Sequence, residues 1–474
     1  MRNSEQIWQL VDAKRAAFEA LSDRVFDMPE IAYTEFRSVA EHTAEMTRQG
    51  FRITESLSGI PTAVMGEAGE GGPVIAILGE YDALPGLSQE AGATEHTPLP
   101  GDGMGHGCGH NLLGSAALLA ATAVKDWLAE NNIAGRVRYY GCPAEEGGAA
   151  KAFMVRAGAF DDVDIAITWH PMPFAGVNDA RSLANTRLDF TFHGRASHAA
   201  AAPHLGRSAL DAVELMNVGV NYMREHMPSD ARIHYAMLDG GGVAPNVVQA
   251  RAKVRYAVRA RDLAEMQALV ARVRKVAEGA ALMTETRVDI VVISAVSNLM
   301  GNAPLERAMQ DQFLRLGPPG FDAEDRAFAE KIRATLTPAD IESHYRRAGL
   351  KPRQDQPLAD EISPLGLIGE AMLGSTDVGD VSWKVPLVQA DGATVAIGTP
   401  FHSWQLTAQG KSPLAKKGMV HVAKVMAATA VEAIGDPSLI SRAKADLAAR
   451  TADMPYVCPI PDDVTPPLQA RPSK

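Results

Sequence analysis

Two histidines and a cysteine lie close together in a glycine-rich segment of the sequence, residues 105–111 (GHGCGHN). Thiolate and imidazole groups both bind zinc, manganese, nickel or cobalt, so the ligand type alone does not identify the ion. Cys108 and His110 are two positions apart, and in an extended chain such residues point to the same side. Taken alone, the segment is equally compatible with a flexible loop whose polar side chains only form hydrogen bonds. A metal site therefore requires further ligands.

Two adjacent carboxylates follow in residues 143–148 (PAEEGG), directly after a predicted strand. In extended backbone Glu145 and Glu146 point to opposite sides, so one can bind a metal while the other stays free. Crowded carboxylates repel each other unless a cation lies between them or one pKa is raised, and a raised pKa suits a general base near neutrality. An isolated Glu-Glu pair is more typical of a solvated turn, but its position after a strand favours a functional role.

Two further histidines end predicted strands, His170 in a Trp-His-Pro context and His402 in a Phe-His-Ser context. Either one alone is more often a hydrogen-bonded histidine. Together with Cys108, His110 and Glu146 they make five candidate ligands, which is enough for two metal ions with an open position for water.

The elements around these residues predict an α/β domain with a mostly parallel central sheet. Hydrophobic patterns predict helices at residues 5–27, 36–49 and 112–128, strands at 74–78, 136–140 and 164–168, and a late strand at 395–397. Alternating strands and helices form parallel sheets, which place their ligands at the carboxyl ends of the strands. The chemical residues are therefore expected on one rim.

The pattern changes near residue 184, where a β-α-β-β-α-β order predicts an inserted ferredoxin-like α+β domain. Its predicted strands cover residues 186–192, 233–238, 247–258 and 286–292, and its helices 208–224 and 263–277. We therefore assign residues 1–183 and 302–474 to the catalytic domain and residues 184–301 to the insert. Residues 455–474 are expected to form a loosely packed tail.

The order of these motifs resembles the dinuclear-metal peptidases and amidohydrolases, which include aminoacylases, carboxypeptidase G-like enzymes and auxin-conjugate hydrolases. The segments STDVGDVSW and GTPFHSWQ extend the resemblance toward the C-terminus. The resemblance implies a zinc-peptidase-like catalytic domain with an inserted lid and dimerisation domain. It also implies two divalent ions bound by five ligands: Cys108, His110, Glu146, His170 and His402. Zinc or manganese is the first expectation, and cobalt or nickel is also compatible.

The resemblance assigns roles to further residues. Glu145 would be the general base and later the acid, and His198 would stabilise the oxyanion, often from the lid of the opposite subunit. That arrangement implies a homodimer through the lid, with a paralogous subunit as the alternative partner. By position, the resemblance also implies that Asn246 and Arg259 bind the substrate's carboxylate and that Asp82 orients a histidine ligand.

Two positions differ from the residues that the relatives have there. Two further motifs could suggest a serine hydrolase or a phosphate-binding loop, but the sequence does not support either. Asn111 stands where the auxin-conjugate branch has aspartate, and Glu80 receives no role. Ser197 lies next to His198, but adjacent side chains rarely reach each other and no G-x-S-x-G elbow is present. The glycines at 240–242 lack the lysine and hydroxyl residue of a phosphate-binding loop.

The resemblance thus predicts a metal-dependent amidohydrolase that cleaves a small N-acyl amino acid with a free carboxylate, such as p-aminobenzoyl-glutamate. A dipeptidase is the first alternative, and it requires recognition of a free amino terminus. A catalytically silent metal-binding subunit of a hetero-oligomer is the second, and the presence of Glu145 beside all five ligands disfavours it.

Composition narrows the partners and the compartment. A net charge of -11 and an isoelectric point near 5.7 disfavour nucleic acid and anionic membranes as partners. The sequence shows no signal-peptide pattern and no long run of apolar residues, and three cysteines in 474 residues fit a reducing compartment. We therefore expect a cytoplasmic protein without a membrane partner.

Overall fold

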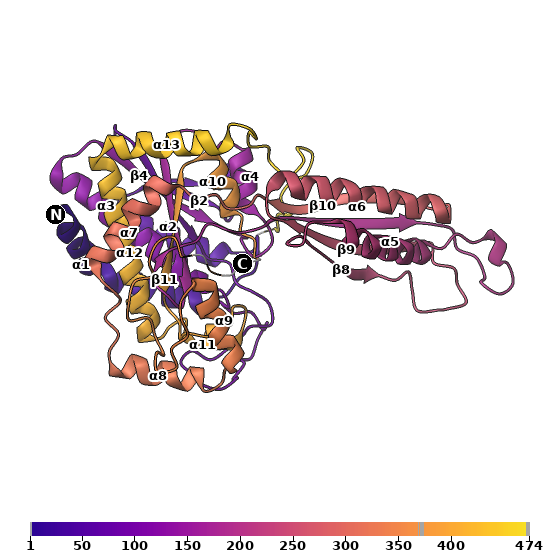
Figure 1. Cartoon of the computed structure of the whole chain (residues 1–474), viewed down its shortest axis with the longest axis horizontal. Coiled ribbons are helices and arrows are strands. Elements are labelled where there is room, and N and C mark those ends of the chain that lie inside the picture. The colour runs from indigo at the N-terminus through magenta and orange to yellow at the C-terminus, as the bar shows by residue number, and fades with distance from the viewer. Residues whose placement is uncertain (1, 368, 370–373, 471–474) are drawn as a thin grey trace.

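The computed structural model describes residues 2–367, 369 and 374–470, and these form a broad body with a narrow projection (Figure 1). A seven-stranded sheet runs through the body in the order β1-β2-β4-β3-β5-β11-β6. Its four central strands, β4, β3, β5 and β11, are parallel, whereas β1, β2 and β6 run antiparallel to their neighbours. The mostly parallel centre predicted from the sequence is confirmed. The strand bounds are β1 Arg52–Glu55, β2 Val64–Glu70, β3 Val74–Glu80, β4 Gly135–Cys142, β5 Ile165–Met172, β6 Gly176–Val177 and β11 Leu387–Ala393.

The core of the body is built on β3, in which every residue is buried. Two long apolar helices, α3 (His110–Asn131) and α12 (Pro413–Gly435), pack against each other and against α1 (Arg2–Phe26). By length and composition α3 and α12 could each span a membrane, but 83% of each apolar window is buried inside the fold. Burial inside the fold accounts for their apolar character, because core helices need the same composition.

The other helices of the body surround this core. Predicted helices at 5–27, 36–49 and 112–128 agree with the structure to within three residues. The remaining bounds are α2 Phe36–Arg48, α4 Ala150–Arg156, α7 Ala303–Leu316, α8 Ala323–Arg333, α9 Pro338–Ala348, α10 Val378–Lys384, α11 Trp404–Gln409 and α13 Pro437–Thr451.

The projection is a four-stranded antiparallel sheet, ordered β10-β7-β9-β8, with two helices on one face (Figure 1). This order and the β-α-β-β-α-β sequence of elements make it ferredoxin-like, as predicted. Alternate residues of β7, such as Phe190 and Phe192, are fully buried with the helices, so the residues between them face the other side. The bounds are β7 Ala184–His193, α5 Ala209–Met223, β8 Arg232–Asp239, β9 Arg251–Ala260, α6 Leu263–Thr284 and β10 Arg287–Val296. We call this projection the lid.

The late strand was predicted at the wrong place. The strand is β11, which ends at Ala393, whereas residues 395–397 are buried residues of the turn that follows. β11 contains Gln389, Asp391 and Gly392, and these residues interrupt the apolar pattern from which a buried strand is predicted. Asp391 is accommodated because the side chain of Asn178 donates a hydrogen bond to it at 2.7 Å.

The end of the described chain is also more firmly attached than expected. The guanidinium group of Arg156 donates hydrogen bonds to the carbonyl oxygens of Pro461 (2.7 Å) and Val464 (2.8 Å), and Ile460 is only 1% exposed. Up to Val464 the chain therefore lies along the body instead of forming a loose tail.

Candidate metal centre

The predicted chemical residues lie at the carboxyl ends of neighbouring parallel strands. β3 ends at Glu80, β4 ends shortly before Glu145, and β5 carries His170 near its end. Parallel strands direct these ends to one edge of the sheet. Helix α3 begins at His110, so the glycine-rich loop before it also meets this rim.

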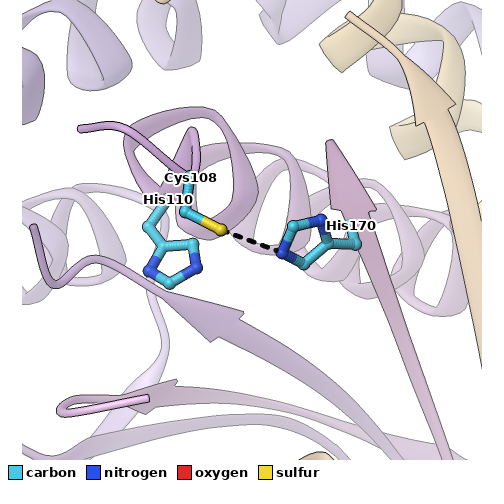
Figure 2. Close-up of side chains that lie close together, drawn as sticks. All are labelled: Cys108, His110 and His170. Carbon is cyan, nitrogen blue, oxygen red and sulfur yellow. Dashed lines mark hydrogen bonds between the residues drawn. The ribbon is translucent and has the colours of Figure 1, made fainter. Parts of the chain in front are cut away.

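The structure brings all five predicted metal ligands together in two groups. Figure 2 shows Cys108 from the glycine-rich loop and His110 from the start of α3 near His170 from β5, with the thiol Sγ 3.4 Å from Nε2 of His170. The ligand atoms of these three residues lie within 4.8 Å of one another, and so do those of Cys108, Glu146 and His402. Cys108 belongs to both groups, which is the arrangement that a bridging ligand between two ions requires.

Asp82 holds two of these ligands in place. Its Oδ1 accepts a hydrogen bond from Nδ1 of His110 at 2.9 Å, and its Oδ2 accepts one from the backbone N–H of Glu146 at 2.8 Å. With Nδ1 protonated, Nε2 of His110 is the free lone pair that faces the cluster. Asp82 thus makes the contacts expected of a residue that orients a histidine ligand.

Some ligand atoms of the cluster are buried, and hydrogen bonds from the described residues do not replace the hydration that they lose. Among the described residues, Nε2 of His110 and Oε1 of Glu146 have no hydrogen-bond partner, although Nε2 lies 3.3 Å from Oε2 of Glu80. Burial disfavours the imidazolium, yet Cys108 and Asp82 raise the pKa of His110 well above its usual range. The cluster therefore attracts positive charge, and its thiol, imidazole and carboxylate donors fit divalent ions such as zinc or manganese.

Glu145 lies beside this cluster in a group with Glu80 and His110 whose ligand atoms are within 4.8 Å of one another. Burial raises the pKa of Glu145 well above its usual range, and the nearby carboxylates, first Glu80 and then Glu146, raise it further. Ala144, which precedes it, has a left-handed φ of 57°. Such a strained alanine persists where the surrounding structure imposes it, which is common next to functional groups.

An ion-pair network behind Glu145 was not found from the sequence. The ammonium group of Lys151 is fully buried and lies 2.6 Å from Oε1 of Glu80 and 2.6 Å from Oδ1 of Asp377. Burial alone would raise the pKa of Glu80, but Lys151 and His110 outweigh it and lower that pKa. Glu80, which received no role, thus binds Lys151. The available signal was a lysine inside the apolar helix α4 (AKAFMVR).

His402 reaches the cluster from the turn after β11. Its backbone N–H donates to the carbonyl oxygen of Gly107 at 3.0 Å, and its Nε2 lies 3.4 Å from Oε2 of Glu146. Its φ of 55° is left-handed, and its side chain is 53% exposed. A strained and exposed ligand marks the side on which the cluster is open to solvent.

Two other residues of the glycine-rich segment stay outside the cluster. The ring of His106 is buried and bonds to the carbonyl oxygen of Val25 at 3.1 Å. The amide of Asn111 donates to Ser22 Oγ (2.9 Å) and to the carbonyl oxygen of Gly410 (3.0 Å). Asn111 therefore links α3 to α1 and to the turn before α12, and its departure from aspartate does not alter the ligand set.

A cavity of about 180 Å³ separates the cluster from the base of the lid. Glu145, Glu146 and His402 line it from the body, and Arg259 lines it from lid strand β9, where substrate binding was predicted. The rest of its lining comes from both domains: Gly147, Ala149, Asn185, Arg187, Ser294, Ala295, Val296, Gly374, Ser375, Thr376 and Asp377.

His198 and Asn246 lie away from this cavity within the chain. The backbone N–H of Ala199 donates to the carbonyl oxygen of Asn246 at 2.9 Å, so both residues belong to one exposed region. They follow β7 and precede β9 at the outer end of the lid. The part of β7 from Asn185 to His193 alone spans roughly 26 Å at about 3.3 Å per residue. Within one chain, neither residue can serve the cluster.

This fold, with a lid inserted into an α/β domain that carries two converging ligand groups, defines a class of dinuclear-metal peptidases and amidohydrolases. A family model described as peptidase family M20/M25/M40 matches residues 76–346, and the chain belongs to this family.

Individual relatives agree with this family. Over 478 aligned positions, 98% of this chain and 99% of the relative, the chain is 46% identical to the B subunit of p-aminobenzoyl-glutamate hydrolase from Escherichia coli K12. It is 29% identical to mouse (Mus musculus) Xaa-Arg dipeptidase over 91% of this chain and 88% of that protein.

Solved structures share the fold. A dinuclear metal-binding peptidase of family M20 from Bacillus subtilis is 18% identical, with a TM-score of 0.55 over 89% of this chain and 99% of the other. An aminobenzoyl-glutamate utilization protein from Klebsiella pneumoniae is 16% identical, with a TM-score of 0.56 over 89% and 98%. The predicted family, fold class and enzyme class are confirmed: the chain is a metal-dependent hydrolase of amide bonds.

Proposed function

We propose that the chain hydrolyses the amide bond of a small N-acyl amino acid with a free carboxylate, with p-aminobenzoyl-glutamate as the leading substrate. The observation that carries the proposal is that two members of a ligand group, Glu146 and His402, line one cavity together with Glu145. Arginine lines the same cavity from the lid. The identity to one subunit of a p-aminobenzoyl-glutamate hydrolase over nearly the whole chain supports the substrate.

Two divalent ions, when bound by the five ligands, would polarise the amide carbonyl and lower the pKa of an attacking water. Glu145 takes the proton of that water and later returns it to the leaving nitrogen, so one carboxyl is first base and then acid. Its raised pKa suits both steps, because the protonated form is stable enough to persist until the C–N bond breaks. The lid wall holds the substrate's carboxylate, and Arg259 does so with a two-pronged group.

A dipeptidase is the second candidate, since Xaa-Arg dipeptidases are among the relatives. A dipeptide presents an ammonium group that needs an unpaired carboxylate. Of the carboxylates that line this cavity, Asp377 is already paired with Lys151, and Glu145 and Glu146 are assigned to the base and the metal ions. The cavity therefore favours an acyl amino acid over a free dipeptide.

We further propose a homodimer through the lid, in which His198 of each chain serves the partner's cluster. β8 is an edge strand of the lid sheet, and the adjacent helix α5 exposes Leu215, Val218 and Tyr222 (39%, 51% and 69%). An open strand edge beside exposed apolar side chains is typical of a pairing surface. A paralogous chain is the alternative partner, because both kinds of p-aminobenzoyl-glutamate hydrolase subunit are among the relatives.

We also propose a cytoplasmic location, which three free cysteines suit.

The test is hydrolysis by the metal-reconstituted chain, with p-aminobenzoyl-glutamate, N-acyl amino acids and dipeptides as substrates and Glu145→Gln as the matched variant. Turnover of the acyl amino acids that requires metal and disappears in the variant supports the proposal. Turnover of dipeptides alone favours the dipeptidase. Two bound ions without any turnover favour a catalytically silent subunit.

A further inference from the structure

Lid strand β7 places an arginine, Arg187, at the wall of the catalytic cavity. Leu188 and Phe190 are fully buried on the helix-covered face of the lid sheet, so Arg187 faces the helix-free side. It lies near the start of β7, the end that joins the body, and it lines the cavity together with Glu145 and His402.

Arg187 is seated closely against the turn that carries Glu145. Its Nη1 donates a hydrogen bond to the carbonyl oxygen of Gly147 at 3.4 Å. A Cβ atom added to Gly147 would lie 2.2 Å from this nitrogen, so the guanidinium lies directly against the backbone of this turn. The first glycine of PAEEGG is favoured by its φ of 133°, and the absence of a side chain there lets the lid arginine approach.

The positive charge of Arg187 has no ion-pair partner among the described residues. In the lid sheet, Arg187 pairs with Ala257 of β9. Two positions before Ala257, Arg255 donates its hydrogen bonds to Asp189, at 2.6 and 3.0 Å. Burial, together with the like charge of Arg255, lowers the pKa of Arg187. The carbonyl oxygen of Gly147 and the more distant charges of Glu145 and Glu146 compensate only part of this lost hydration, since the pKa stays lowered. A partly buried guanidinium without a carboxylate in contact favours binding of an anion from outside.

A second guanidinium lies on the same wall. Arg259 pairs with Asn185, two residues before Arg187, so the two arginines are diagonal neighbours on one face, with Cβ atoms about 7–8 Å apart. Both line the cavity opposite the carboxylates of the body. The body wall suits the amide to be cleaved, whereas the lid wall can hold two carboxylates at once.

We propose that Arg187 binds the side-chain carboxylate of the substrate's amino acid and thereby selects N-acyl derivatives of acidic amino acids. This inference rests on the proposed amidohydrolase function, in which Arg259 takes the α-carboxylate. Guanidinium and carboxylate match as a two-pronged pair, and the pair forms in a partly dehydrated cavity where such hydrogen bonds are strong.

The test compares two nearly isosteric substrates, p-aminobenzoyl-glutamate and p-aminobenzoyl-glutamine, in the metal-reconstituted full chain. We expect the wild type to prefer the glutamate compound by about 10–100-fold in kcat/KM, mainly through KM. Arg187→Gln should abolish this preference, so that the ratio of the two kcat/KM values falls to about one, and an unchanged circular dichroism spectrum shows that the variant is folded. Arg187→Lys should retain part of the preference, because it keeps the charge but not the fork.

Arg255→Gln is the matched control, since it removes an arginine from the same sheet face outside the cavity. It should leave the preference unchanged. If Arg187→Gln keeps the preference, or slows both substrates equally, the assigned role of Arg187 is wrong while the amidohydrolase function stands. If the wild type hydrolyses neither compound nor any other acyl amino acid, the proposed function itself fails.

Discussion

Replacing Asp82 by asparagine should weaken metal binding without removing any ligand. The carboxylate accepts from Nδ1 of His110 at 2.9 Å and from the backbone N–H of Glu146 at 2.8 Å. Asparagine keeps one acceptor oxygen, while its amide nitrogen would face one of these donors. The loss of one charge-assisted hydrogen bond, about 1.5–3 kcal/mol, should lower metal affinity about 10–100-fold.

Metal affinity is measured by competition with a chelator of known affinity, and activity is followed while metal is added back. Asp82→Asn should regain most activity at excess metal, because Glu145 and all five ligands remain. Asp380→Asn is the control: Asp380 is a buried carboxylate that bonds Ser297 and Tyr456 and touches no proposed ligand. An affinity of Asp82→Asn within about threefold of the wild type would refute the reasoning.

Three further predictions concern the base, the buried lysine and the pH dependence of stability. Glu145→Gln should reduce kcat about 10²–10⁴-fold in steady-state assays, with unchanged metal content by elemental analysis. Lys151→Met leaves two buried carboxylates without their cation and should cost about 3–5 kcal/mol in urea unfolding. Lys416→Met, at a more exposed pair, should cost at most about 1 kcal/mol. Burial raises the pKa of Asp380 from 3.8 to about 7, so the folded chain holds this proton and loses stability as the pH rises toward and through 7. Asp380→Asn should therefore gain about 2–3 kcal/mol relative to the wild type between pH 5 and pH 8, and equal pH profiles would contradict this.

The convergence of the candidate ligands could be predicted from the sequence because its signals are local. Cys108 and His110 share one glycine-rich loop, and Glu145 and Glu146 follow one strand. The rule that parallel strands gather their ends at one edge then sufficed to place them with His170. The ferredoxin-like order of the lid was equally local, since each element shows its own hydrophobic period.

Contacts between segments far apart in the sequence needed the structure. Lys151 pairs with Asp377, 226 residues away, and no periodic pattern marks such a pair. Arg187 reads as an ordinary polar residue of an alternating strand until the lid brings it against Gly147. The strand that precedes His402 was misplaced because β11 carries a buried carboxylate, Asp391, whose hydrogen bond comes from a distant side chain, Asn178.

The sequence by itself thus determined which groups can do chemistry and at which ends of which strands they stand, because side-chain type and strand period are properties of short segments. Tertiary structure decided which of them meet. It joined Cys108 to both ligand groups, paired Glu80 with Lys151, and left His198 at the outer end of the lid, roughly 26 Å or more from the cavity. Distances between such residues depend on how whole elements pack, and that packing is set by buried area summed over the fold instead of by any one motif.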